Sequence, residues 1–197
     1  MSDFLNDAEY RTASWRRRHS PEAIAQLGVW RWKGIQKHAG RILDLICGKR
    51  VIDFGGADGP LGFGSIMVDE KANYKTLDDV PGPVDVIFTS HTLEHLDAPA
   101  PWLDNACSRL VSGGCNEREE PVEGGRLIAH VPAWTCSRWR QDEYHNPRQP
   151  NGHKTTFSLG EATPCDATNI LGMLTSFDIE LAEYVGDDSI FVIARKP

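Results

Sequence analysis

The sequence lacks the features of a secreted, membrane-bound or disulfide-stapled protein. No stretch approaches the ~20 consecutive apolar residues that a membrane span requires, and the first residues show neither the basic nor the apolar segment of a secretion signal. The five cysteines are odd in number and nowhere form a C-x-x-C pair, which argues against a disulfide framework and against a zinc finger. We therefore expect reduced thiols, a cytoplasmic location and no membrane partner.

The sequence also lacks an excess of positive charge. With 21 lysines and arginines against 28 aspartates and glutamates, the formal net charge is −7. Proteins whose affinity depends on wrapping a phosphate backbone need clustered, uncompensated Lys and Arg. The basic triplet at 16–18 is typical of a solvated helix face. We therefore expect no nucleic-acid partner.

Length and composition predict one folded domain. The 197 residues are 40% hydrophobic and 25% charged, an ordinary globular composition with enough apolar residues for a sizeable core. Because no internal repeat, low-complexity tract or linker interrupts them, we expect a single domain over 1–197. We divide it into a helical N-terminal cap (1–49), a core (50–132), a long irregular loop (133–158) and a C-terminal helix and hairpin (159–197).

Apolar runs and periodicity predict an α/β fold. Short apolar runs predict buried parallel strands at 50–54, 65–69, 84–89 and 126–131. Helical spacing predicts a poor helix at 21–37 and further helices at 41–46, 101–111 and 167–174, with an acidic surface insertion at 115–123. Alternation predicts a final hairpin of strands at 177–185 and 190–195. The expected fold is a doubly wound, mostly parallel sheet with an antiparallel C-terminal hairpin.

The most informative motif lies at 51–59, Val-Ile-Asp-Phe-Gly-Gly-Ala-Asp-Gly, where an apolar run passes directly into a glycine-rich loop. Glycines remove the Cβ atoms that would keep backbone N–H groups from closely approaching a nucleotide or nucleoside. Two further segments follow in the order of a doubly wound sheet: 84–96, which ends in Ser-His-Thr-Leu-Glu-His-Leu, and 124–132. Together they predict a nucleoside-containing ligand at one edge of the sheet.

In these motifs the sequence resembles the class I S-adenosylmethionine-dependent methyltransferases over roughly residues 50–195. It is similar above all to the type 11 and type 23 groups, which share a Leu-Glu-His signature after the fourth strand. The resemblance implies a Rossmann-like methyltransferase fold, S-adenosylmethionine as cofactor and S-adenosylhomocysteine as product. The residues that it assigns to the cofactor are Asp53, Gly55, Gly56, Ala57 and Gly59 for the amino-acid part, Asp69 for the ribose hydroxyls, Leu77 and Asp78 beside the adenine, and Ser90 and His91 at the sulfonium.

Two features depart from the family pattern. Ala57 stands where the family usually has a glycine. Asp69 follows Gly55 by only 14 positions, whereas a ribose-binding acid normally comes about 20 residues along, after a full helix. Pro60 and the repeated glycines at 59–64 break helices. We therefore expect a shortened first crossover and a more open cofactor pocket.

The run His-Thr-Leu-Glu-His that begins at His91 also matches the H-x-x-E-H signature of inverted zinc peptidases. That site needs both histidines on one helix, but His91 directly follows a predicted strand, and Pro99 and Pro101 leave room only for a short helix. We therefore expect no metal site. Glu94 is interpreted as a polar residue at a helix start, where the helix dipole favours a carboxylate, and His95 fits that role or a functional one equally.

The expected activity is methyl transfer to a small-molecule or saccharide acceptor at a hydroxyl. Enzymes that methylate the exocyclic amines of bases carry an Asn/Asp-Pro-Pro-aromatic turn where this chain has Ser-His-Thr-Leu, which disfavours a nucleic-acid base. A hydroxyl needs a base to take its proton, and we expect His153 to serve, or else His91 or His145. The alternative is a non-catalytic nucleoside-binding module that has lost its acceptor site.

Three other residues near the expected site have two interpretations each. His130 lies within an apolar strand and is interpreted as a core or cofactor-side histidine rather than a base. Trp134 and Trp139 either stack on an acceptor or anchor the long loop to the core.

Overall fold

The computed structural model describes residues 35–56, 61–62, 64–115, 119, 121–136, 153–163, 167–186 and 189–197. The helices in this part of the chain are η1 (Gln36–His38), α4 (Ala39–Ile46), η2 (Leu77–Asp79), η3 (Leu93–His95), α5 (Pro99–Arg109) and α7 (Ile170–Met173), where η marks a 3-10 helix. The strands are β1 (Val51–Phe54), β2 (Ile66–Val68), β3 (Val86–Ser90), β4 (Gly114–Cys115), β5 (Pro121–Val122), β6 (Arg126–Pro132), β7 (Phe157–Ser158), β8 (Thr168–Asn169), β9 (Asp178–Val185) and β10 (Ser189–Arg195). None of the described helices is long and apolar enough to cross a membrane.

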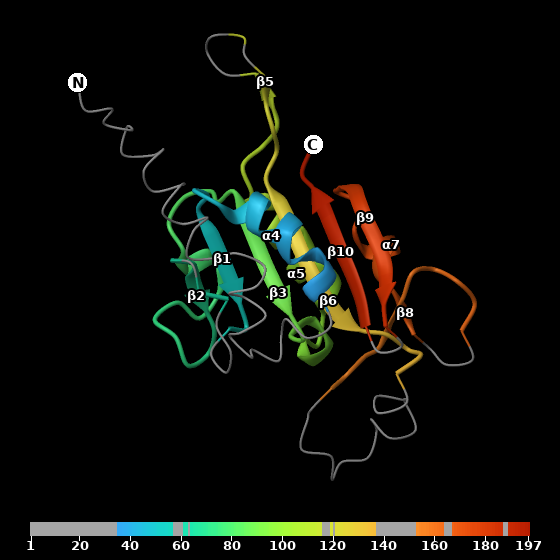
Figure 1. Ribbon diagram of the computed structural model, residues 1–197. Coiled ribbons are helices and arrows are strands. Elements are labelled where there is room, and N and C mark those ends of the chain that lie inside the picture. The colour runs from blue at the N-terminus through green and yellow to red at the C-terminus, as the bar shows by residue number, and fades with distance from the viewer. Residues whose placement is uncertain are drawn as a thin grey trace, which may run out of the picture.

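A six-stranded sheet in the order β2-β1-β3-β6-β10-β9 forms the centre of the molecule (Figure 1). The pairs β1–β2, β1–β3 and β3–β6 are parallel, whereas β10 runs antiparallel to both β6 and β9. All five residues of β3 are buried, as expected for a strand covered on both faces. The mostly parallel sheet with an antiparallel C-terminal hairpin is therefore confirmed.

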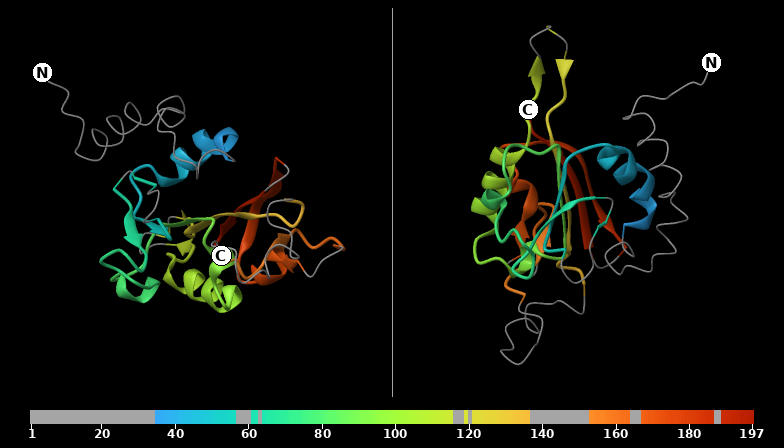
Figure 2. Two further views of the ribbon diagram at one scale, coloured as in Figure 1. Left: turned by 90° about the horizontal axis from the view of Figure 1, so that it is seen from below. Right: turned by 90° about the vertical axis from the view of Figure 1, so that its left-hand side faces the viewer.

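Helices α4 and α5 cover opposite faces of this sheet (Figure 2). Successive side chains of a strand point to opposite faces, so β3 contributes to both halves of the core. Val86 and Phe88 pack on the α4 side with Ile42 of that helix. Ile87 packs on the other side with Leu103 of α5. Each face of the sheet is thus covered by its own apolar cluster.

The described parts of the connections at the β2 end of the sheet contain little helix. Between β1 and β2, none of the described residues 55, 56, 61, 62, 64 and 65 is helical, and Gly62 and Gly64 have positive φ angles of 78° and 75°. Residues 69–85, all described, contain only the short turn η2. The N-terminal helix expected at 21–37 lies almost wholly outside the described residues.

The element predicted least well is the helix at 167–174. Thr168 and Asn169 pair with Phe157 and Ser158 as the strands β8 and β7, so only Ile170–Met173 is helical. Pairing with the distant strand β7 therefore makes Thr168 and Asn169 a strand, although local spacing predicted a helix there. The acidic insertion was better placed, because its described ends form the exposed hairpin β4–β5, which projects from the sheet (Figures 1 and 2).

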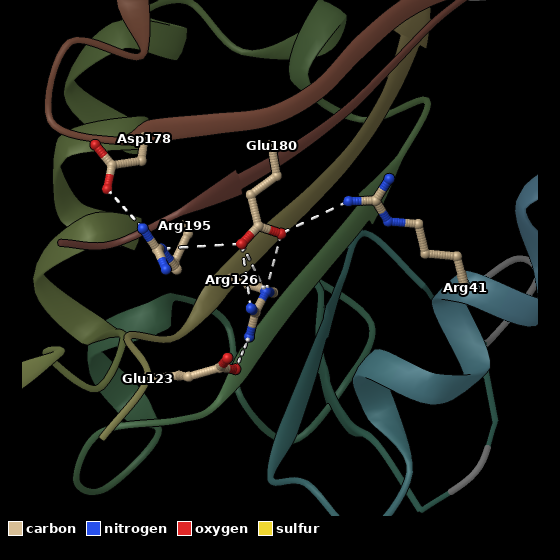
Figure 3. Close-up of polar contacts among 6 residues, drawn as sticks. All are labelled: Arg41, Glu123, Arg126, Asp178, Glu180 and Arg195. Atoms are coloured by element: carbon tan, nitrogen blue, oxygen red, sulfur yellow. Dashed lines mark hydrogen bonds and ion pairs between the residues drawn. The ribbon is translucent and has the colours of Figure 1, made fainter. Parts of the chain in front are cut away.

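A charged network ties strands and a helix together at the edge where β6 begins (Figure 3). Glu180 on β9 accepts hydrogen bonds from Arg126, the first residue of β6, at 3.1 Å from both Nε and Nη2. Arg41 of α4 and Arg195 of β10 reach the same carboxylate at 3.8 and 3.9 Å. The hydrogen bonds that Arg126 donates to Glu180 raise the pKa of Arg126, against the effect of burial. This network stabilises the edge of the sheet opposite the carboxyl ends of its parallel strands.

Candidate functional site

The carboxyl ends of the parallel strands share one edge of the sheet, the lower edge in Figure 1. In open α/β sheets ligands bind at this edge. The cofactor residues that the sequence predicts lie after β1, after β2, in η2 and at the end of β3. We therefore describe the edge strand by strand.

The loop after β1 is held by a buried carboxylate. Asp53 is fully buried, and its Oδ2 accepts the N–H of Leu61 at 2.6 Å. A Cβ at Gly56 would collide with the same carboxylate, and one at Gly55 (φ +73°) would collide with the side chain of Thr92. The glycines are thus required by the packing of the protein itself, a different reason from the ligand approach that the sequence suggested. Two further cofactor candidates, Ala57 and Gly59, lie outside the described residues.

The acid at the end of β2 lies next to this loop. The N–H of Gly55 donates to the carbonyl of Val68 at 2.9 Å, and Asp69 follows directly. Asp69 is half-buried, and its Oδ1 accepts the N–H of Lys71 at 2.9 Å, which fixes its side chain in a turn. The structure therefore brings together the glycine loop and the predicted ribose-binding acid.

The two residues predicted beside the adenine differ in exposure. Leu77 is only 2% exposed and belongs to the core on the α5 side. Asp78 is exposed, and its Oδ2 accepts a hydrogen bond from Asn105 at 3.4 Å. A ligand at η2 would meet the Asp78 side chain and the backbone rather than the Leu77 side chain.

At the ends of β3 and β6, two histidines lie in edge-to-face contact. Ser90 is buried, and its hydroxyl shares a 3.1 Å hydrogen bond with Nδ1 of His130 on β6. The ring of His91 lies edge-on to that of His130, with centroids 4.6 Å apart. His91 has φ +52°, an uncommon backbone conformation for a residue other than glycine, and such strain is often found at functional sites. His130 is the buried, hydrogen-bonded histidine that the sequence suggested.

The buried carboxylate of Glu94 lies among three histidines, and the sequence did not predict its burial. Glu94 is 0% exposed, and its Oε1 lies 3.3 Å from Nδ1 of His91 and 4.0 Å from Nε2 of His153. The rings of His95 and His153 are in edge-on contact at 4.5 Å. Glu94 lies in the first turn of a helix, as the sequence predicted, but that helix is the three-residue η3 and the carboxylate is buried.

The backbone brings the distant histidine to this turn. The N–H of Lys154 donates to the carbonyl of Glu94 at 2.7 Å, and Lys154 also pairs with Asp97 at 2.5 Å. Burial, helped by the neighbouring His95 and His91 and opposed by Glu94, lowers the pKa of His153 to about 4. His153 is therefore neutral at physiological pH and offers a lone pair to a ligand.

The remaining candidates of the long loop are separated from this cluster or undescribed. Trp134 donates from Nε1 to Glu161 at 2.7 Å and contacts the hydroxyl of Tyr184, so it anchors its end of the loop to the core. His145 and Trp139 lie outside the described residues. Of the three expected bases, the structure thus places His91 and His153 around one carboxylate.

Comparison with known proteins gives a likeness in fold. No family profile matches the sequence, and a search of curated proteins finds no match either. Among solved structures, the chain is similar to one from the complex between the Haloferax volcanii Trm112 methyltransferase activator and a putative methyltransferase, with TM-score 0.53 and 11% identity over 97% of this chain and 98% of that one. A SAM-dependent methyltransferase from Aquifex aeolicus gives TM-score 0.45 and 13% identity over 89% and 97% of the two chains. The N-terminal domain of EvdMO1, crystallised with SAH and D-fucose, gives TM-score 0.45 and 13% identity over 82% of each. The sheet order and the first likeness show a Rossmann-like α/β fold.

Proposed function

We propose that the protein binds S-adenosylmethionine at the carboxyl edge of its sheet and transfers the methyl group to a hydroxyl of a small-molecule or saccharide acceptor. The observation that carries this proposal is the meeting of the glycine loop, Asp69 and His91 at the ends of three adjacent parallel strands. The shared fold with a chain of a complex that contains a putative methyltransferase supports it.

The cofactor would lie across the ends of β1, β2 and β3. We assign the amino-acid part to the backbone at Gly55 and Gly56, with Ala57 and Gly59 added from the sequence alone. We assign the ribose hydroxyls to the carboxylate of Asp69, which is half-buried at the end of β2. The adenine would lie along η2, and the sulfonium would lie near Ser90.

Methyl transfer needs alignment and a proton acceptor. The acceptor oxygen forms a bond to the methyl carbon while the carbon–sulfur bond breaks, and that electron pair stays on sulfur to give the neutral thioether. The sulfonium is already a good leaving group, so the protein mainly aligns the reactants and excludes water. The hydroxyl proton must pass to a base.

Among the expected bases, His91 fits this task best. The carboxylate of Glu94 lies 3.3 Å from Nδ1 of His91, so it can orient the ring while Nε2 faces the acceptor. A pKa of about 4 makes His153 a weak base at physiological pH, since general bases work best when their pKa is near the operating pH. His145 stays a candidate from the sequence.

Calorimetric titration with S-adenosylhomocysteine tests the cofactor site. We expect millimolar or tighter binding, and we expect Asp69→Ala to weaken it about 10- to 150-fold, the equivalent of the ~1.5–3 kcal/mol of a hydrogen bond to a charged group. Asp44→Ala is the matched control, because Asp44 is an exposed acid on α4, away from this edge. Absence of binding at millimolar ligand, or equal binding by both variants, would contradict the site.

A screen of hydroxyl acceptors with methyl-labelled donor tests the transfer step. We expect labelled product with the wild type and a ~10²–10⁴-fold slower reaction with His91→Ala, which is typical of the loss of a general base. The S-adenosylhomocysteine affinity of this variant is measured separately, because His91 also borders the proposed cofactor site. Binding of the cofactor product without transfer to any acceptor would favour the alternative of a non-catalytic binding module.

A further inference from the structure

We propose that Glu94, His95 and His153 bind one divalent transition-metal ion. One ligand atom from each of the three side chains lies within 4.8 Å of the other two. Among the described residues, these three form the one group of this kind. The sequence led us to expect no metal, because the H-x-x-E-H run has no long helix. The structure instead supplies ligands from the short turn η3 and from a segment distant in the chain.

The buried carboxylate of Glu94 needs a cation. Neither of its oxygens is hydrogen-bonded to any residue that the structure describes, and both are inaccessible to solvent. A buried carboxylate is costly unless it is paired, hydrogen-bonded or bound to a metal. The groups in ionic contact with it are the imidazoles of His91 and His153, which carry charge only when protonated. A divalent ion supplies the positive charge at any pH at which the imidazoles are neutral.

The donor set selects the class of metal. Two imidazoles and one carboxylate form the ligand set of many catalytic zinc sites and of non-haem iron sites, whereas magnesium and calcium prefer oxygen ligands alone. With metal–ligand bonds of about 2.0–2.2 Å, tetrahedral ligand atoms lie about 3.3–3.5 Å apart. The separation of 4.0 Å between Oε1 of Glu94 and Nε2 of His153 is therefore within a small side-chain rotation of that geometry.

The fold holds these ligands together without the metal. Glu94 and His95 are neighbours on η3, and the backbone of the segment that carries His153 is hydrogen-bonded to the carbonyl of Glu94 through Lys154. The pair between Lys154 and Asp97 makes a second link between the segment and the residues after η3. Two independent contacts thus fix the distant ligand beside the other two.

Three protein ligands leave a coordination position for water or for an acceptor oxygen. The use of this open position rests on the proposed function. An ion beside His91 would bind the acceptor hydroxyl and lower the pKa of that hydroxyl, so that its proton leaves more easily. Specificity for hydroxyl acceptors would then come from the metal. The site itself requires no methyl transfer.

Titration of chelator-treated, untagged protein with zinc chloride and with cobalt chloride tests the site. We expect one ion per chain, a higher melting temperature with metal, and a visible cobalt spectrum of a low-coordinate site. Glu94→Gln, H95Q and H153Q should each lower zinc affinity by more than the 10- to 100-fold that loss of a supporting residue causes. His38→Gln is the matched control, because His38 pairs with the carboxylate of Glu183 elsewhere in the fold and its loss should leave zinc affinity unchanged.

The outcomes separate this site from the proposed function. Lack of stoichiometric binding at micromolar metal, or equal affinity in the three ligand variants and the control, would overturn the metal site. Should Glu94→Gln fail to fold, H95Q decides the question, because the His95 side chain is only half-buried. S-adenosylhomocysteine is titrated into the same samples. Metal binding without S-adenosylhomocysteine binding would contradict methyl transfer and support the metal site. Binding of S-adenosylhomocysteine without metal binding would support the cofactor site and contradict the metal site.

Discussion

The side chain of Asp53 shows how a residue predicted at a ligand site can also have a structural role. The sequence places it at the end of β1, in the loop assigned to the cofactor. The structure shows a buried carboxylate that accepts the N–H of Leu61 and lies against Gly56. Asp53 therefore shapes the loop from within, and its influence on a ligand would act through the backbone.

Asp53→Ala should destabilise the protein by about 1–3 kcal/mol, because the buried N–H of Leu61 loses its acceptor. Urea unfolding followed by circular dichroism measures this change. Asp69→Ala is the control, since its carboxylate is half-buried and caps a surface turn; we expect a change within about 0.5 kcal/mol. Equal stability of the two variants would mean that the Asp53 carboxylate does not hold the loop.

The environment of Glu94 could not be predicted from the residues around it. Local sequence places a glutamate at the start of a turn, where a solvated carboxylate is common. Its burial depends on the segment of His153 and Lys154, which reaches η3 through tertiary contacts. The H-x-x-E-H run was the available signal, and the sequence analysis set it aside because the run has no long helix.

Elements whose sequence shows a strong pattern were predicted well, and those decided by distant partners were not. The strands β1, β3 and β6 are continuous apolar runs, because both faces are covered, and each was predicted to within two residues at either end. The two-residue strand β8 has no pattern of its own and forms by pairing with β7. Tertiary contact therefore overrode helical spacing at 168–169.

The turn η2 depends on one carboxylate whose ionisation can be tested. Asp79 accepts the N–H groups of Thr76 and Lys75 at 2.8 Å each, and these backbone hydrogen bonds lower its pKa from the ordinary 3.8. Because the folded pKa is lower than the unfolded one, this stabilisation is complete above about pH 4 and is lost as the pH falls through the folded value.

Asp79→Asn should therefore lower stability at pH 6 and reduce the loss of stability between pH 6 and pH 3, since the group that titrates is gone. Urea midpoints at the two pH values measure both effects. Asp78→Asn is the control on the same turn, because the Asp78 side chain accepts a hydrogen bond from Asn105 and none from the backbone N–H groups that Asp79 holds. A pH dependence of Asp79→Asn equal to that of the wild type would show that the carboxylate does not support η2.

Across the whole molecule, the proposed site and the charged network around Glu180 lie at opposite edges of one sheet. The glycine loop, Asp69 and the histidine cluster lie at the carboxyl ends of the parallel strands. The network of Glu180 lies at the other edge, where β6 begins (Figure 3). The sequence predicted the first edge through its motifs, but it could not predict the second, because the charged residues of the network come from β6, β9, β10 and α4.

Glu180→Ala tests this separation of the two edges. The Glu180 side chain is 20% exposed and that of its partner Arg126 is 17% exposed, so the burial of this ion pair is intermediate between that of a surface pair and that of a fully buried pair. We therefore expect a loss of about 1–3 kcal/mol in the free energy of unfolding. Asp178→Ala removes a pair that is 56% and 39% exposed and should cost less than about 0.5 kcal/mol. Zinc and S-adenosylhomocysteine affinities should be unchanged in both variants, because neither side chain contacts the carboxyl edge. A weakened affinity in folded Glu180→Ala would show instead that the network positions the site through β6, whose far end carries His130 against His91.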